Sequence, residues 1–361
     1  MKLIIISRDP KVLEVGSPVR NRMLEYGKLF DELYVIICAR THNNNFEEKL
    51  LNNIFLYNSR SNNFFFVFIK TLGILFKICK KLKKEKNVWI STHDPFEAGI
   101  IGVLGKMIYG FGLQFQIHTD FLDPGFKREK FINKVRVFIA KKILPYADSI
   151  RVVSDRIKDS LKTENLKLKT SSIHVLPIFV DVEKIKNQKI AFDLHKKYPE
   201  FEKIILIASR LTKEKNLDLA LRSFSKILHK LPNAGLVIVG SGSEEVWLKK
   251  YATYLKIENN VRFEGWVNDP VSYYKSSDMF LITSLYEGYG MSIVEALASS
   301  CPVVSTDVGV AKEIGAVIVN YDPGEIALKA VDVLSTNKKQ INIDSINKEE
   351  YLIRFKKTFT V

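Results

Sequence analysis

Short apolar segments alternate with helical segments along the whole chain, and this order limits the fold more than any other feature of the sequence. Runs such as LIIIS (3–7), VWIST (88–92) and KIILIAS (203–209) are typical of buried strands. The segments between them carry apolar residues at helical spacing. Buried strands that are joined by helical crossovers form a parallel sheet with helices on both faces. The sequence therefore predicts an α/β fold.

The strand–helix order begins anew near residue 203, which predicts two Rossmann-like units. A length of 361 residues fits two domains of roughly 150–200 residues each. Pro177 and the polar stretch 183–189 indicate the linker between them. We predict a first domain at residues 1–180 and a second at 190–345. Their sheets are expected to face a ligand-binding cleft at the carboxyl ends of the strands.

Charge distinguishes the two halves of the chain. Residues 1–190 contain 33 Lys and Arg against 19 Asp and Glu, whereas residues 191–361 contain 22 against 21. The basic excess predicts that the first half meets an anionic partner, such as a membrane surface, a lipid phosphate or a nucleic acid. No motif that combines aromatic and basic residues for nucleic-acid recognition is present, so a nucleic acid is not favoured.

The lysine-rich segment 70–86 has two interpretations. Its lysines accompany an apolar stripe that includes Leu72, Leu75 and Phe76, and FFFVFI (64–69) comes directly before it. A basic amphipathic helix can lie on an anionic bilayer, where each nearby lysine contributes roughly 1 kcal/mol. Alternatively, a crossover helix packs the stripe on the sheet and leaves its lysines in water. The stripe fits the second interpretation better, but the basic excess of this half favours contact with a membrane.

The cysteines and the start of the chain bear on location. Cys38, Cys79 and Cys301 are scattered and odd in number, which is typical of a reducing compartment. The apolar run after Met1 is too short for a signal peptide, and no window reaches the ~18 apolar residues that span a bilayer. We expect a cytoplasmic protein that is either soluble or peripheral on the cytoplasmic face of the membrane.

The sequence contains no recognisable pattern of metal ligands. Its histidines and cysteines lack metal-ligand spacing, and it has no Asp-x-Asp pair of the kind that brings a divalent cation to a sugar diphosphate. We therefore expect chemistry without a metal.

Residues 284–298, SLYEGYGMSIVEALA, combine a strand end, a glycine-containing turn and a helix start. Gly288 and Gly290 let the backbone approach a ligand closely, because glycine has no Cβ. The helix start offers free N–H groups and a positive dipole end, which suit a diphosphate. Glu287 and Glu295 can each accept paired hydrogen bonds from the hydroxyls of a hexose or a ribose. Alternatively, both are surface charges, but the strand–turn–helix context favours a nucleotide-sugar site.

A second group of charges, SRLTKEKN (209–216), directly follows the strand KIILIAS. Arg210 and Lys215 lie near the end of that strand, and an arginine fork with a lysine suits a pyrophosphate leaving group. The alternative is a solvated turn before a helix, capped by Thr212 or Asn216. This segment alone does not separate the two interpretations.

Five blocks in order over about residues 203–315 resemble family 4 of the retaining glycosyltransferases, which have the GT-B fold. The blocks are R-L-x-x-x-K-N, VIVGSGSE, VRFEGWV, SDMFLITSLYEGYGMSIVEALA and PVVSTDVG. In that family, two glutamates eight residues apart contact the donor sugar and the ribose, which implies these roles for Glu287 and Glu295. The resemblance also implies that Arg210 and Lys215 hold the diphosphate.

The resemblance implies further donor contacts in the second half and a packing site for the end of the chain. The nucleotide base is implied to lie beside Gly265 and Val267. The carboxyl-terminal segment 346–361 is implied to form a helix that packs back on the first domain. The turn residues implied to lie against the sugar and the phosphates are Gly288, Tyr289, Gly290, Met291 and Ser292.

The first half resembles the family less closely. Gly16 and Ser17 stand in the place of a glycine-rich loop, on the donor and acceptor side respectively, but the usual Gly-Gly pair is absent. His118, at the end of LQFQIHTD, matches a histidine that contacts the donor sugar near the reacting centre; the alternative is a buried strand-end histidine. Asp120 is either an acceptor-side group or a helix cap. Phe179 replaces the glycine expected at the hinge between the domains.

The resemblance implies a retaining, metal-independent hexosyltransferase with Glu287, His118, Arg210 and Lys215 as its catalytic residues. The donor is expected to be a UDP- or GDP-linked sugar and the only small molecule required. The acceptor is expected to be a saccharide or a lipid-linked molecule in the synthesis of cell-surface glycans or glycolipids. Two alternatives stay open. One is a nucleotide-sugar epimerase of the same fold, and the other is a non-catalytic, membrane-associated partner in a polysaccharide assembly complex.

Overall fold

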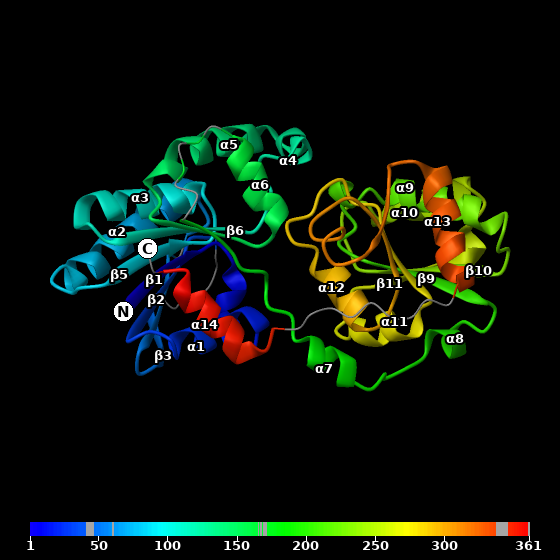
Figure 1. Ribbon diagram of the computed structural model, residues 1–361, viewed down its shortest axis with the longest axis horizontal. Helices are drawn as coiled ribbons and strands as arrows, with labels where there is room; N and C mark the ends of the chain where they lie inside the picture. The colour runs from blue at the N-terminus through cyan, green and yellow to red at the C-terminus, as the bar shows by residue number, and fades with distance from the viewer. Residues whose placement is uncertain are drawn as a thin grey trace. The chain divides into compact units, whose positions relative to one another are not determined.

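The computed structural model describes residues 1–40, 47–59, 61–164, 166, 168, 172–336 and 346–359. The chain divides into two compact units (Figure 1). The first unit comprises Met1–Pro177 together with Lys348–Val361, and the second comprises Ile178–Asn347. Among the described residues, no helix combines the length and the apolar character that crossing a membrane requires.

The first unit contains an eight-stranded sheet in the order β3-β4-β2-β1-β5-β6-β7-β8. All of its strand pairs are parallel except β3 with β4. The strands are β1 (Lys2–Ser7), β2 (Glu32–Ile37), β3 (Glu47–Leu51), β4 (Ile54–Asn58), β5 (Val88–Thr92), β6 (Gly112–Ile117), β7 (Ser149–Val152) and β8 (Ile173–Val175). The β3–β4 hairpin at the edge was not anticipated, because EEKLL in β3 is half exposed and lacks the apolar run of a buried strand.

Helices cover both faces of this sheet. They are α1 (Pro18–Gly27), α2 (Phe64–Leu82), α3 (Glu97–Tyr109), α4 (Pro124–Glu129), α5 (Phe131–Ile143), α6 (Asp155–Thr163) and α14 (Lys348–Lys357). The apolar stripe of α2 packs inward, with Leu75, Cys79 and Leu82 buried, so the crossover-helix interpretation of that stripe is confirmed. Lys130 has an extended backbone and separates α4 from α5.

Helix α14 lies beside α1 in the first unit (Figure 1). The ring of Phe355 stacks on Tyr26 with 4.0 Å between centroids. Arg151 of β7 donates to the hydroxyl of Tyr351 at 2.8 Å, and the Gln114 amide of β6 donates to Thr358 at 2.9 Å. Buried aromatic packing and hydrogen bonds to two central strands therefore hold this end of the chain on the first unit.

The second unit has a six-stranded sheet in the order β11-β10-β9-β12-β13-β14, with every pair parallel. Its strands are β9 (Lys203–Ala208), β10 (Ala234–Val239), β11 (Val261–Gly265), β12 (Met279–Ile282), β13 (Val303–Thr306) and β14 (Val317–Val319). Its helices are α7 (Val182–Asn187), α8 (Leu194–Lys197), α9 (Leu217–Leu228), α10 (Glu245–Tyr254), α11 (Pro270–Ser276), α12 (Met291–Ala298) and α13 (Pro323–Thr336). Two parallel-sheet α/β units confirm the predicted fold class.

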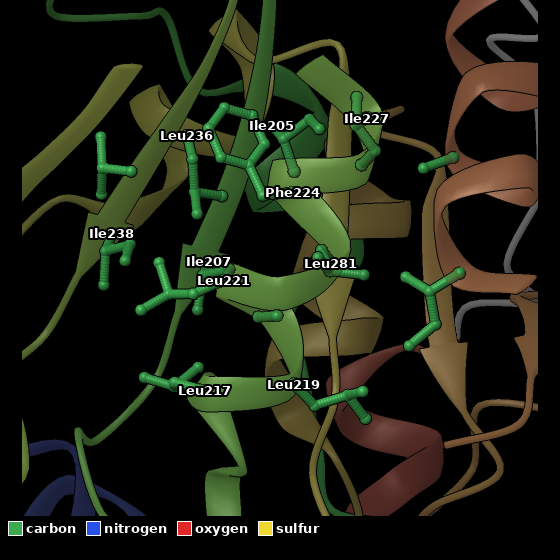
Figure 2. Close-up of a cluster of buried hydrophobic side chains, with 14 of the residues drawn as sticks. Ile205, Ile207, Leu217, Leu219, Leu221, Phe224, Ile227, Leu236, Ile238 and Leu281 are labelled. Atoms are coloured by element: carbon green, nitrogen blue, oxygen red, sulfur yellow. The ribbon is translucent and has the colours of Figure 1, made fainter. Parts of the chain in front are cut away.

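A packed core between α9 and the sheet fixes the strands of the second unit. Figure 2 shows Phe224 and Leu221 of α9 beside Ile205 and Leu236 of β9 and β10, all fully buried. The segment predicted to be a linker contains α7, whose Ile185 belongs to a buried cluster with residues of α11 and α12. The core holds the carboxyl ends of β9, β10, β12 and β13 in place, and the candidate donor residues lie at these ends.

Candidate functional site

The turn between β12 and α12 positions the helix start at the carboxyl edge of the second sheet. Gly290 precedes the helix in the left-handed conformation (φ +86°), which glycine adopts without strain. The loop after β13 holds the turn, because the Val310 N–H donates to the Tyr289 carbonyl at 3.0 Å. A Cβ at Gly309 would lie 2.4 Å from that same carbonyl, so the loop approaches the turn as closely as glycine permits.

Lys215 and Glu287 meet in this region from different strand ends. The ammonium of Lys215 lies 2.6 Å from Glu287 Oε1, and the two side chains are only 12% and 15% exposed. The Ser284 hydroxyl donates to the same Oε1 at 2.8 Å. Sequence reasoning had placed both charged residues in the donor site without pairing them. The structure brings them together.

Hydrogen bonds to the end of β12 hold the loop that carries Lys215. Lys215 ends a short 3-10 turn, and Asn216 follows it with a left-handed backbone (φ +52°). The Thr283 hydroxyl bonds to the carbonyl oxygens of Lys215 and Asn216, at 3.2 and 3.0 Å. The Leu285 N–H donates to the Glu214 carbonyl at 2.8 Å. The position of the Lys215 ammonium therefore depends on a neighbouring strand.

A small hollow opens between the ends of β9 and β12. Lys215 and Glu287 line it, together with Ser284 and with Ser292 in the first turn of α12. The first N–H groups of an α-helix have no partner within the helix, so this hollow combines a cation, a carboxylate and free backbone donors. Such a set can bind a ligand that carries both hydroxyl groups and negative charge.

Arg210 lies outside this pair. Its guanidinium side chain is 74% exposed and lies 3.1 Å from Glu214. Its backbone is tightly constrained on both sides: a Cβ at Gly240 would lie 1.8 Å from the Ser209 carbonyl, and a Cβ at Gly242 would lie 2.3 Å from the Leu211 carbonyl. The base of the arginine is therefore held by close backbone packing between the loops after β9 and β10, while its charged end is in solvent.

Glu295 and the predicted base-binding residues lie in different surroundings from the Lys215–Glu287 pair. Glu295 accepts a hydrogen bond from the Tyr274 hydroxyl of α11 at 3.4 Å, and burial raises the pKa of its carboxyl. It is not among the residues that line the hollow beside Glu287. Gly265 has a left-handed backbone (φ +71°), and its carbonyl accepts from the Gly240 N–H at 2.7 Å. Val267 packs against a buried cluster of the second unit.

In the first unit, His118 follows β6 and lies beside a second histidine. The rings of His118 and His93, which follows β5, are 5.9 Å apart and nearly perpendicular. Burial lowers the pKa of His93 to about 3 and holds the pKa of His118 well below its usual range, and the charges of Arg22 and Arg151 act in the same direction. Both imidazoles are therefore neutral near pH 7.

The remaining residues predicted in the first unit make local contacts. Gly16 is left-handed (φ +81°) and leads into Ser17, which caps α1 by accepting from the Arg20 N–H at 3.1 Å. Asp120 accepts from the Ser160 hydroxyl at 2.6 Å and from the Leu122 N–H at 3.1 Å, and burial raises its pKa. Capping and buried hydrogen bonds account for the side chains of Ser17 and Asp120. The donor-side role of Gly16 and the acceptor-side roles of Ser17 and Asp120 stay predictions.

Several residues that shape these regions were not anticipated from the sequence. Ser284 bonds to Glu287, and Thr283 bonds to the loop that carries Lys215. In the sequence, only their position as two hydroxyl residues directly after an apolar strand could have indicated these contacts. His93 was also missed, although it follows β5 as His118 follows β6. Its Nε2 is buried and has no hydrogen-bond partner among the described residues. Neither sequence position revealed this contact between two imidazoles.

Comparison with known proteins finds a matching family model and several relatives of this chain. The family model described as "Glycosyl transferases group 1" matches residues 191–350. An uncharacterized glycosyltransferase of Methanocaldococcus jannaschii is 29% identical over 266 residues, which cover 70% of this chain and 64% of the relative. The N-acetylgalactosamine-N,N'-diacetylbacillosaminyl-diphospho-undecaprenol 4-alpha-N-acetylgalactosaminyltransferase of Campylobacter jejuni is 30% identical over 244 residues, covering 66% of this chain and 64% of the relative. The chain thus spans less than two thirds of the length of both relatives.

A solved structure has the same fold. The crystal structure of HepE from Anabaena in complex with UDP superposes with a TM-score of 0.70 at 16% sequence identity, and the match covers 99% of this chain and 94% of that one. At this level of identity the likeness concerns the fold, which is the GT-B architecture expected from the sequence.

Proposed function

Because residues 191–350 match the family model of the glycosyl transferases group 1, we propose that this chain is a retaining hexosyltransferase whose second unit binds a nucleotide sugar. The observation that carries the proposal is the contact of Lys215 with Glu287 beside the start of α12. A buried cation, a carboxylate and a helix start suit the two parts of such a donor, namely its diphosphate and its sugar hydroxyls.

The proposed roles follow from the contacts of each group. Lys215 and Ser284 both contact Oε1 of Glu287, so Oε2 accepts from a hydroxyl of the donor sugar. Lys215 and the backbone N–H groups of Gly290, Met291 and Ser292 stabilise the negative charge that grows on the leaving diphosphate. Arg210 leaves the nearby Glu214 carboxylate to bind the same diphosphate, which its exposed guanidinium permits. Glu295 binds the ribose, and Gly265 and Val267 lie beside the base.

We propose that transfer proceeds on one face of the sugar. The acceptor hydroxyl oxygen forms a bond to the anomeric carbon as the bond to the diphosphate oxygen breaks, and the leaving phosphate takes the hydroxyl proton. His118 is neutral and serves to orient the sugar. The positive charge comes from Lys215, Arg210 and the helix start, so the reaction proceeds without a metal. The alpha linkage in the name of the Campylobacter relative supports retention, since hexoses are commonly alpha-linked in UDP-sugars.

The proposed donor is UDP- or GDP-linked, and the proposed acceptor is a saccharide or a lipid-linked molecule in cell-surface glycan or glycolipid synthesis. UDP in the HepE crystal structure supports the first, and the diphospho-undecaprenol in the name of the Campylobacter relative supports the second. We also propose that the basic first unit lies on the anionic cytoplasmic face of a membrane. An epimerase of the same fold would release nucleotide without an acceptor, whereas the transferase releases it only when acceptor is added.

Glu287→Gln tests the proposed role of the pair. The amide keeps the shape of the side chain but loses the charge that faces Lys215, so we expect transfer to fall at least about 100-fold. The control is Glu245→Gln on α10, whose carboxylate makes an exposed pair with Lys249 in the same unit and whose loss should leave transfer within about twofold. Full activity of Glu287→Gln would remove the assignment, and thermal unfolding shows whether the variant is folded.

A further inference from the structure

Helix α5 exposes a row of large apolar side chains on one face. Phe131 is 80% exposed and Phe138 is 63% exposed, and Val135 between them is also exposed. Residues at positions i, i+4 and i+7 lie on one side of a helix, so these three form a continuous stripe. Single exposed apolar residues are ordinary on a protein surface, but a contiguous stripe indicates an interaction surface.

Contacts on the opposite side of α5 fix its rotation. Val137 and Ala140 are buried, and the Arg136 guanidinium donates twice to Glu97 of α3, at 2.9 and 2.8 Å. The other oxygen of Glu97 accepts from Arg8 at 2.8 Å, directly after β1. The helix is therefore bound to the body of the first unit through its inner face. Its aromatic stripe cannot turn inward without breaking this buried network.

The charges around the stripe are almost all positive. Residues 124–143 contain seven Lys and Arg and one acidic residue, Glu129. Lys134 and Lys142 are exposed on α5, and the Lys142 ammonium lies 5.8 Å from the centre of the Phe138 ring. A second copy of this face would repel the first, because both would be positive. An anionic bilayer complements it, since phenyl rings enter the headgroup boundary while lysines meet the lipid phosphates.

The topology of the sheet decides where the stripe lies. Helix α5 connects the end of β6 to the start of β7, so its first turn lies at the carboxyl edge of the first sheet. His118 and Gly16 lie at the same edge, after β6 and β1. The lysines that follow Phe76 lie at the end of α2, which reaches the opposite edge before β5 begins. Helix α2 also begins at this edge, after β4, with the exposed residues Phe64–Phe66, but most of its lysines lie toward its other end. In α5 the exposed aromatic residues and the lysines alternate along one short helix, so α5 is the basic helix that presents both at the same place.

We propose that the exposed stripe of α5 and its flanking lysines seat the first unit on an anionic lipid bilayer. This inference rests on the proposed function and names the surface by which the enzyme meets the membrane that holds its acceptor. The sequence suggested this membrane role for segment 70–86. The inference assigns it instead to α5, through Phe131, Val135, Phe138, Lys134 and Lys142.

Vesicle co-sedimentation of the full chain tests the inference. The probes are vesicles of phosphatidylcholine alone and of phosphatidylcholine mixed with phosphatidylglycerol, at low and high salt. We expect binding only to the anionic vesicles and a loss of binding as salt screens the charges. F131S/F138S should weaken binding about tenfold, and K134Q/K142Q should weaken it about fivefold for each lysine. The control W247S/Y254S removes two exposed aromatic residues from α10 of the second unit and should bind as wild type.

Each outcome has a definite meaning. If wild type binds anionic vesicles and the α5 variants bind equally well, α5 is not the membrane surface, and the membrane proposal passes to another basic element. If wild type binds anionic vesicles no better than neutral ones, the inference and the membrane part of the proposed function both fail. If F131S/F138S lowers the molar mass measured by light scattering without vesicles, the stripe joins two copies and the inference is overturned. Transfer to a soluble acceptor, measured with Glu287→Gln, tests the proposed chemistry separately.

Discussion

The strand ends of the two units differ in how they hold charge. In the second unit, Lys215 and Glu287 meet at 2.6 Å, and each neutralises the other while both are largely buried. In the first unit, His93 and His118 lie together, and burial with two nearby arginines lowers the pKa of both. The second unit therefore has a paired charge beside its candidate donor residues, and the first unit has neutral imidazole rings after β5 and β6.

This difference fits two kinds of ligand group. A diphosphate needs fixed positive charge, and a carboxylate beside that charge reduces the cost of burying it before the ligand binds. A sugar hydroxyl can also bind a neutral partner that donates or accepts, which an uncharged imidazole provides. The proposed contacts of Lys215 with the diphosphate and of His118 with the sugar thus follow from electrostatics as well as from the order of motifs.

Lys215→Met removes the cation from the charge pair of the second unit, and it has the largest expected effect. The variant keeps the length of the side chain and removes its charge, so we expect kcat/KM for transfer to fall about 100- to 1,000-fold. Lys213→Met is the matched control, because this lysine belongs to the same 3-10 turn but is exposed. Equal losses in the two variants would show that positive charge near the loop matters and that the buried pair does not.

The double variant K215M/E287Q sharpens the same test. Lys215→Met leaves a largely buried carboxylate without its cation, which lowers the free energy of unfolding. Removing the second charge should restore much of that loss while transfer stays absent. Recovery of transfer together with stability would assign the pair to folding alone.

A pH series of unfolding experiments tests whether the two histidines of the first unit are neutral, and its expected effect is smaller. Between pH 6.5 and about 3, the unfolded chain protonates His93 and the folded chain does not. The free energy of unfolding therefore falls as the pH drops below 6.5, with a contribution from His93 of about 2 kcal/mol between pH 6.5 and 5. His118 acts in the same direction.

His93→Gln should flatten this pH dependence in denaturant unfolding. The same slope in His93→Gln and wild type would contradict a neutral, buried imidazole at this position.

The sequence predicted the repeated βα order and most strands, because buried parallel strands are apolar along their whole length. It missed β3, whose half-exposed residues EEKLL lack such a run. The candidate donor residues could be proposed from the sequence because glycine turns and charges at strand ends follow local rules. The pairing of Lys215 with Glu287 was not, since it joins residues 72 apart through hydroxyl groups of a neighbouring strand. The neutral state of His118 depends on burial and on the charges of Arg22 and Arg151, which have no local sequence pattern.

The central claim is that the Lys215–Glu287 region binds a nucleotide sugar, and donor-dependent thermal unfolding tests it most directly. UDP-glucose, GDP-mannose and ADP-glucose would each be titrated into wild type and into Lys215→Met. We expect one donor to stabilise wild type, by about 2.7 kcal/mol at 100 times its Kd, and to stabilise Lys215→Met far less at the same concentration. An unfolding temperature that none of the three donors raises, or an equal rise in both proteins, would contradict the claim.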